Sequence, residues 1–149
     1  GHGNCGKSTC ASRVPLPWKA LSDDEAVVFL KESGEYYAHP FPTWSEYLLN
    51  KSEKTWNIEE GVKLRAIFFL EQGIIDGVTP LNKAESTLKI SASANEVYNK
   101  FYVRLNEGIK KTQRMKIFSN ACEFSKNIPC YTLKATLHGK FWEEMEKVV

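Results

Sequence analysis

The stretch NIEEGVKLRAIFFLEQG, residues 57–73, decides the predicted fold. Asn57 and Glu60 are spaced like an N-terminal helix capping pair, and Gly73 suits the end of a helix. Between them, apolar residues recur at the three- and four-residue spacing of a buried helix face. The stretch therefore predicts a long apolar helix at the centre of the core.

Similar helix-start signals occur before and after this stretch. Ser22 stands three residues before Glu25 with acidic residues between them, and Pro80 suits the first position of a helix. Thr43 and Ser93 open further capping pairs of the same kind. The expected helices cover residues 23–33, 43–49, 57–73, 79–88, 93–108 and 142–149.

Two stretches near the C-terminus have the two-residue alternation of half-buried strands. In QRMKIF (113–118), Met115 and Ile117 alternate with basic residues, and YTLKATLH (131–138) alternates throughout. The sequence therefore predicts an α+β fold that is mainly helical. We expect about five to six helices and a small C-terminal antiparallel β-hairpin.

Residues 1–20 differ from the rest of the chain, because they are rich in Gly, Ser and Pro and end in VPLPW (14–18). The two prolines of that segment favour extended backbone before them. We expect an N-terminal tail or extended strap, whose first two residues, Gly1 and His2, resemble the remnant of a cleaved purification tag. Residues 21–149 are then predicted to form a single globular domain of common size.

The composition argues against a membrane protein and against a metal site. The longest apolar runs, AVVFL (26–30) and AIFFL (66–70), are far shorter than the roughly 20 residues that span a bilayer. The N-terminus lacks the apolar core of a secretory signal, so we expect a soluble, cytoplasmic protein with no membrane association. The four cysteines lack the paired spacing and histidine partners of a zinc site, and we expect neither metal nor cofactor.

Residues GHGNCGKS (1–8) match the complete phosphate-binding loop pattern G-x-x-x-x-G-K-[ST]. Such a loop needs a strand that leads into it and a helix that leaves it. Here no residue precedes Gly1, and Pro15 limits a helix starting at Lys7 to about two turns. We therefore interpret the string as non-functional and expect no enzymatic activity.

Aromatic side chains crowd an acidic segment in the N-terminal half. Residues 21–60 carry nine acidic residues against three lysines. Aromatic residues of this kind are the usual anchors of protein interfaces. The leading hypothesis is a non-enzymatic binding or regulatory module that contacts another protein, or a second copy of itself as a homodimer. The residues expected to make this contact are Tyr36, Tyr37, Phe41, Trp44 and Trp56.

The segment LKISASANEVYNKFYVRLNEG (88–108) resembles the turn and recognition helix of winged helix-turn-helix domains. The resemblance implies a nucleic-acid-binding role for residues 88–138, with part of the helix in a groove and basic residues on phosphates. The turn SASA is longer than is typical of that motif. The groove residues would be Asn95, Asn99 and Lys100, and the phosphate contacts would be Arg104, Lys110, Arg114, Lys116 and Lys134.

A third hypothesis is an enzyme with an unrecognised cleft near His39. Glu35, Tyr36 and Tyr37 would form an acid–base cluster with this histidine if their loop folded over a cleft. The competing interpretation is that these loop aromatics pack on the core beside a solvated glutamate.

Overall fold

The structure is a computed structural model, and it describes residues 5–22, 24–43, 45–50, 53 and 55–149. The chain divides into two compact units. One lies within residues 6–65, and the other consists of residues 66–149 together with Cys5.

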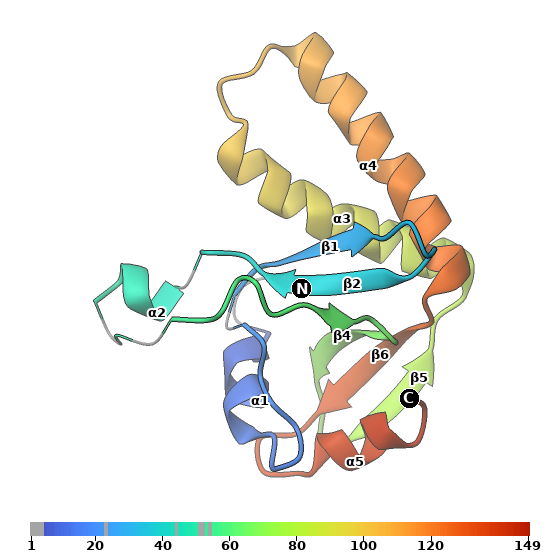
Figure 1. The fold of residues 1–149 in the computed structure, drawn as a ribbon. Coiled ribbons are helices and arrows are strands. Elements are labelled where there is room, and N and C mark those ends of the chain that lie inside the picture. Colours follow the sequence, from blue (N-terminus) through green and yellow to red (C-terminus); the bar gives the residue numbers. More distant parts are fainter. Residues whose placement is uncertain (1–4, 23, 44, 51–52, 54) are drawn as a thin grey trace. The chain divides into compact units, whose positions relative to one another are not determined.

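The unit of residues 6–65 is built on a small antiparallel sheet (Figure 1). Its strands β1 (Ala26–Leu30), β2 (Tyr36–Pro40) and β3 (Val62–Lys63) lie in the order β1-β2-β3. Helix α1 (Lys7–Arg13) precedes the sheet, and the short helix α2 (Ser45–Leu48) lies between β2 and β3 in the sequence.

Strands β1 and β2 form a hairpin where the sequence predicted a helix over residues 23–33, so that prediction is wrong. The Ser22 hydroxyl donates to the Glu25 carbonyl at 3.1 Å, so this hydroxyl binds a carbonyl in the chain leading into β1. Gly34 has φ +82° in the turn between the strands, where its N–H donates to the Lys31 carbonyl. The residues that suggested helix ends therefore shape the two ends of β1.

The second unit contains a mixed sheet with β6 (Cys130–Ala135) at its centre. Strand β4 (Ile67–Gln72) pairs with β6 in parallel, and β5 (Gly77–Pro80) pairs with its other side antiparallel. Phe68 lies opposite Tyr131 across the parallel pair, and their rings stack with centroids 5.3 Å apart. This pairing joins residues separated by more than half of the unit's sequence.

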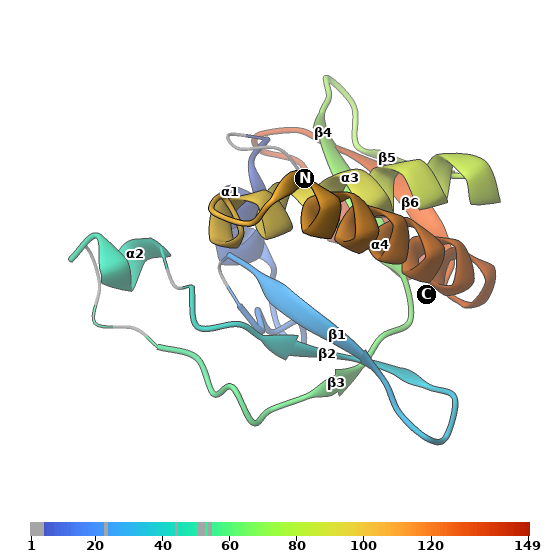
Figure 2. The same ribbon diagram turned by 90° about the horizontal axis from the view of Figure 1, so that it is seen from above.

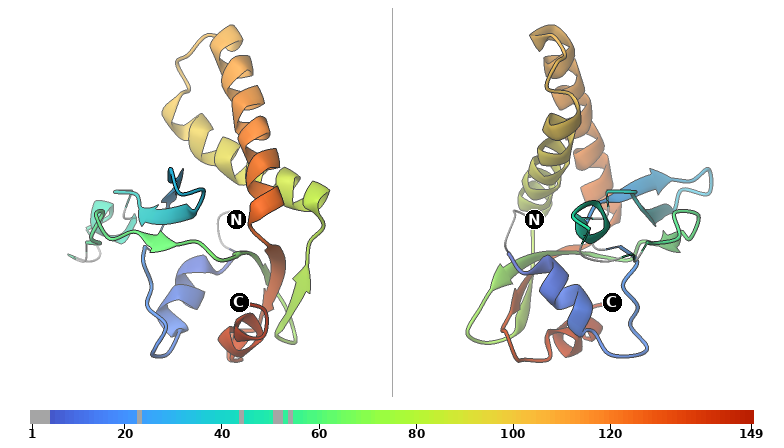
Figure 3. Two further views of the ribbon diagram at one scale, coloured as in Figure 1. Left: turned by 45° about the vertical axis from the view of Figure 1, so that its right-hand side comes forward. Right: turned by 90° about the vertical axis from the view of Figure 1, so that its left-hand side faces the viewer.

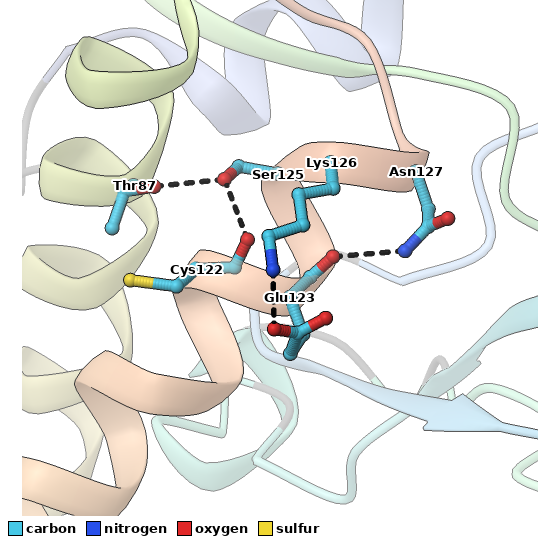
Figure 4. Close-up of polar contacts among 6 residues, drawn as sticks. All are labelled: Thr87, Cys122, Glu123, Ser125, Lys126 and Asn127. Atoms are coloured by element: carbon cyan, nitrogen blue, oxygen red, sulfur yellow. Dashed lines mark hydrogen bonds and ion pairs between the residues drawn. The ribbon is translucent and has the colours of Figure 1, made fainter.

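Two long helices connect β5 to β6 as a helical hairpin that projects from the sheet of the same unit (Figure 3). Helices α3 (Lys83–Phe101) and α4 (Glu107–Asn127) pack side by side, as Figure 2 also shows. The Thr87 and Ser125 hydroxyls meet across the two helices at 2.8 Å near the sheet end of the hairpin (Figure 4). Helix α5 (Phe141–Glu146) follows β6 and contacts β5 and β6.

The core of this unit lies between the sheet and the base of the helical hairpin. Strand β6 supplies three of its buried side chains, because both edges of the strand are paired. Helix α5 adds Phe141, and the C-terminal half of α4 together with Ile128 directly after it adds the rest of the apolar set. These buried apolar residues are Ala121, Phe124, Ile128, Cys130, Leu133, Ala135 and Phe141.

The predicted fold class is wrong in its proportions. The described residues form an α+β fold with two three-stranded sheets, and not a mainly helical fold of five to six helices with one C-terminal hairpin. The expected strand at 131–138 exists as β6, but it is the central strand of a mixed sheet.

The stretch 57–73 accounts for much of this error. Asn57 caps no helix; its side chain accepts the Glu59 N–H at 3.0 Å and its carbonyl accepts the Glu60 N–H, which closes a turn. The apolar run that follows becomes β4, whose alternate side chains lie on opposite sides of the sheet. Conversely, the expected strand at 113–118 lies inside α4, because Asn106 caps the helix that contains it.

The capping box of α3 gives a direct test of this fold. The Asn82 side chain accepts the Glu85 N–H at 3.0 Å, and the Glu85 carboxylate accepts the Asn82 N–H at 3.1 Å. We expect Asn82→Ala to lower the free energy of unfolding by about 1 kcal/mol, measured by urea denaturation. Asn99→Ala, at an exposed position of the same helix, should change it by less than about 0.5 kcal/mol. Equal effects of the two substitutions would contradict the assigned cap.

Candidate functional site

Three aromatic residues of the set expected in the N-terminal half lie in β2 or directly after it. Tyr36 and Tyr37 belong to β2, Phe41 follows it directly, and all three are half-buried, as is Trp56. Trp44 lies outside the described residues. Part of each described ring therefore remains open for contact with another molecule.

Three exposed apolar side chains of the sheet follow one another in β1. Val28 is 39% exposed, Phe29 is 52% exposed and Leu30 is 60% exposed. Sequence reasoning missed these residues because it placed them in a helix. The signal was present in the run AVVFL, whose β-branched and aromatic residues favour a strand.

The backbone of β1 faces β2 on one side only. Lys31 N–H donates to the Glu35 carbonyl, and Phe41 N–H donates to the Glu25 carbonyl, at the two ends of the hairpin. Because hydrogen-bonded pairs alternate in an antiparallel ladder, the backbone groups of Ala26, Val28 and Leu30 point away from β2. Strand β1 is the outer strand of the described sheet, so these groups line its outer edge.

Charged side chains around the hairpin are largely paired. The Glu35 carboxylate contacts the Lys63 ammonium at 2.5 Å, and this contact holds the pKa of Glu35 below its usual value, against the opposing effect of burial. The Lys31 ammonium lies 3.5 Å from the centre of the Tyr37 ring. Lys19 pairs with Glu60 at 2.9 Å. The acidic character of the segment is therefore partly compensated within the unit.

The His39 ring is held by packing contacts. Its Nδ1 lies 3.3 Å from the Ile58 carbonyl oxygen, and the ring meets Phe29 edge to face at 5.5 Å. A side chain at Gly61 would overlap the same ring. Among the described residues no carboxylate forms an ion pair with this histidine.

The phosphate-loop string is described only in part, because residues 1–4 lie outside the described residues. Gly6 has φ +97°, and α1 begins at Lys7, without a side-chain cap at its N-terminus. The helix ends at Arg13, and Val14 is extended before Pro15, as the proline predicts. A short helix therefore does leave the motif at its lysine.

The expected winged-helix arrangement is wrong. The segment SASA lies within the continuous helix α3, and the expected wing strand at 113–118 lies within α4. Asn95, expected in a groove, donates its side-chain amide to the Ser91 carbonyl at 2.8 Å in its own helix. Lys110, expected on a phosphate, pairs with Glu107 at 2.9 Å.

The remaining residues of the expected nucleic-acid set are spread over four places in the second unit. All of them are exposed. Asn99 and Lys100 end α3, Arg104 lies in the connection after it, Arg114 and Lys116 lie in the middle of α4, and Lys134 lies in β6.

The cysteines are free thiols in the described residues. Burial raises the pKa of the Cys130 thiol, although a hydrogen bond involving Ser86 opposes the effect. Within the described ranges, no group of three or more His, Cys, Asp or Glu residues is placed to hold a metal ion. No helix of the described chain is both long enough and apolar enough to cross a bilayer.

The close approach of Gly61 to His39 makes a testable packing contact. We expect Gly61→Ala to lower the free energy of unfolding by about 1–3 kcal/mol, because the added methyl group overlaps the ring. In a His39→Ala background the same substitution should lower the free energy of unfolding clearly less. Thermal unfolding of the parent chain, the two single variants and the double variant would measure this difference. Gly77→Ala is the matched control, since no atom lies within 4 Å of its added methyl group. An undiminished cost in the His39→Ala background would contradict the contact.

Comparison with known proteins identifies a family. No curated protein and no solved structure matches the chain. The model of the family described as SynChlorMet cassette protein ScmC matches residues 1–149. Because the match covers the whole length, the chain belongs to the ScmC family.

Proposed function

We propose that this ScmC-family chain is a non-enzymatic binding module that takes an extended apolar segment of a partner protein as an additional strand beside β1. The observation that supports this function is the exposure of Val28, Phe29 and Leu30 on an outer strand. Natural sheets usually protect such edges with charged residues, proline or bulges. Strand β1 has none of these between Ala26 and Leu30.

The hairpin offers both parts of strand-addition recognition. Main-chain hydrogen bonds would come from the outward backbone groups of Ala26, Val28 and Leu30. Alternate side chains of the added segment would pack beside Phe29 on one face and beside Val28 and Leu30 on the other. Tyr37 lies directly opposite Phe29 on β2, so the expected aromatic residues would support the contact from the inner strand.

A proline substitution in β1 tests the outer backbone edge without disturbing the pairing of β1 with β2. Val28→Pro removes an outward N–H and leaves the ladder to β2 intact, whereas Val28→Thr keeps the N–H at the same position. The probe is a displayed library of extended peptides selected on the whole chain. Selected peptides should bind the threonine variant within about threefold of the parent chain and the proline variant at least about tenfold more weakly, measured by titration.

Two further measurements show that the variants are folded and that the peptide binds at β1. Circular dichroism and melting temperature must show that both Val28 variants stay folded. Hydrogen exchange on the peptide complex should slow at the amides of residues 26, 28 and 30. Peptides that bind the proline variant as well as the parent chain would overturn the proposal.

A second candidate function is binding of a nucleotide phosphate by the string GHGNCGKS. It is favoured by the left-handed Gly6 and by α1 starting at Lys7, although this helix has only the two turns that Pro15 led us to expect. Backbone N–H groups at such a helix start, with the lysine beside them, are the parts of the loop that contact phosphates. Only residues 5–8 of the string are described.

Thermal unfolding with magnesium ATP decides between the two interpretations of the string. Binding at a hundredfold excess over Kd would add about 2.7 kcal/mol to the free energy of unfolding and so raise Tm by several degrees. Lys7→Ala should abolish the rise, and Arg13→Ala, at the other end of α1, should keep it. An unchanged Tm at millimolar nucleotide would leave the string non-functional.

A further inference from the structure

The end of the α3–α4 helical hairpin carries apolar side chains that the chain leaves exposed. This end, here called the hairpin tip, comprises residues 100–111, which close α3, connect the helices and open α4 (Figure 3). Val103 is 68% exposed and Phe101 is 54% exposed, and Tyr102 and Ile109 are exposed as well. Four large apolar side chains therefore reach solvent within one short segment.

The packed part of the hairpin lies at its other end. The buried residues of the two helices are Ser86, Thr87 and Ser91 in the N-terminal half of α3, and Ala121, Phe124 and Ser125 in the C-terminal half of α4. Thr87 and Ser125 join the helices there (Figure 4). Because α4 has 21 residues, it is about 30 Å long. The hairpin tip thus projects away from the core of its unit, and its apolar side chains add little to that core.

Hydrogen bonds give the hairpin tip a defined shape. The Leu105 N–H donates to the Tyr102 carbonyl at 3.2 Å, which closes a turn with Val103 and Arg104 at its centre. The Asn106 side chain accepts the Ile109 N–H at 2.9 Å and so caps α4. An apolar side chain and a basic side chain therefore stand next to each other at the apex.

Positive charge dominates the same region. Residues 99–116 contain one acidic residue, Glu107, whose carboxylate accepts a hydrogen bond from the Lys110 ammonium at 2.9 Å. This hydrogen bond and the charge of Lys110 hold the pKa of Glu107 below its usual value. In the part of the chain that the structure describes, no carboxylate forms an ion pair with Arg104 or Lys111. The basic residues of this region are Lys100, Arg104, Lys110, Lys111, Arg114 and Lys116.

An anionic lipid surface matches both properties of the hairpin tip. Its headgroup phosphates attract lysine and arginine, and the acyl chains beneath them accept aliphatic and aromatic side chains. Long basic side chains can keep their charge among the headgroups while their stems are buried. A nucleic acid would attract the same charges but offers the aliphatic side chains of Val103 and Ile109 little apolar surface. A folded protein would need a cavity shaped for a protruding turn, whereas a fluid bilayer deforms around it.

We propose that the hairpin tip binds the surface of an anionic phospholipid membrane, with Val103 inserted below the headgroups and Arg104 held at their phosphates. Phe101 and Ile109 would add apolar contact on either side of the turn. A contact of this kind lies on the membrane and needs no helix that crosses it. It departs from the expectation of no membrane association, which considered only spanning segments and secretory signals. The hairpin tip and β1 belong to different units, so the proposal does not rest on the proposed function.

Co-sedimentation of the full chain with vesicles tests the role of charge. We expect binding to vesicles of equal parts phosphatidylcholine and phosphatidylserine, weaker binding at high salt, and at least about tenfold weaker binding to phosphatidylcholine alone. Arg104→Glu should weaken binding to the anionic vesicles at least about tenfold. Lys83→Glu changes the net charge equally at an exposed position at the opposite end of α3, and should weaken binding by less than about threefold.

Two changes at Val103 test insertion of the apex. Val103→Ser should weaken binding at least about fivefold, because less apolar surface leaves water, whereas Ile74→Ser, at an exposed isoleucine outside the hairpin tip, should change it by less than about twofold. Lipids brominated on their acyl chains should quench the added indole of Val103→Trp and leave that of Ile74→Trp unquenched. Circular dichroism should show an unaltered fold for all variants, since every substituted position is exposed.

Several outcomes would overturn the membrane contact. A chain that binds anionic and neutral vesicles equally, or that is weakened as much by Lys83→Glu as by Arg104→Glu, has no specific contact at the hairpin tip. Vesicle binding without quenching of the Val103→Trp indole would exclude insertion of the apex. Retention of a single-stranded oligonucleotide without any binding to vesicles would assign the basic surface to nucleic acid instead.

Discussion

The second unit depends on the position of β6 between β4 and β5. A central strand needs partners on both edges, and here one partner runs parallel and the other antiparallel. The parallel partner β4 ends before β5 and the two long helices begin, so the sheet closes only after the chain has returned through α3 and α4. The stacked pair Phe68 and Tyr131 and the buried side chain of Leu133 hold this late-arriving strand in register.

The pairing of β6 with a strand far away in the sequence explains why some elements were predictable from the sequence and others were not. Strand β6 was expected because its own alternation carries the signal, and a strand of this kind shows its two faces locally. Strand β4 was mistaken for a helix because the apolar residues of the stretch 57–73 also fit the spacing of a helix face. The strand that pairs with β4 begins more than 60 residues later in the sequence. A pairing over that distance leaves no trace in the residues around Ile67.

Capping patterns misled in a related way. Asn57 and Ser22 carry the residue types of helix caps, but the Asn57 side chain closes a turn and the Ser22 hydroxyl donates to the Glu25 carbonyl before β1. Asn82 and Glu85 have the same spacing and do form a cap. Among the candidate site residues, Tyr36 and Tyr37 lie in β2 and Phe41 follows it, and their expected contact with another protein stays a prediction. The exposed edge of β1 was missed, because recognising an edge requires knowing the order of the strands.

Cys130 gives the central strand a chemical reporter. Its thiol is buried, its S–H points to the Ile128 carbonyl oxygen at 3.6 Å, and burial raises its pKa, so both access and thiolate formation are suppressed while β6 is paired. An alkylating reagent can reach this sulfur only when the strand separates from its neighbours. The rate at which Cys130 is alkylated therefore reports how often the sheet opens, without any added label or substitution.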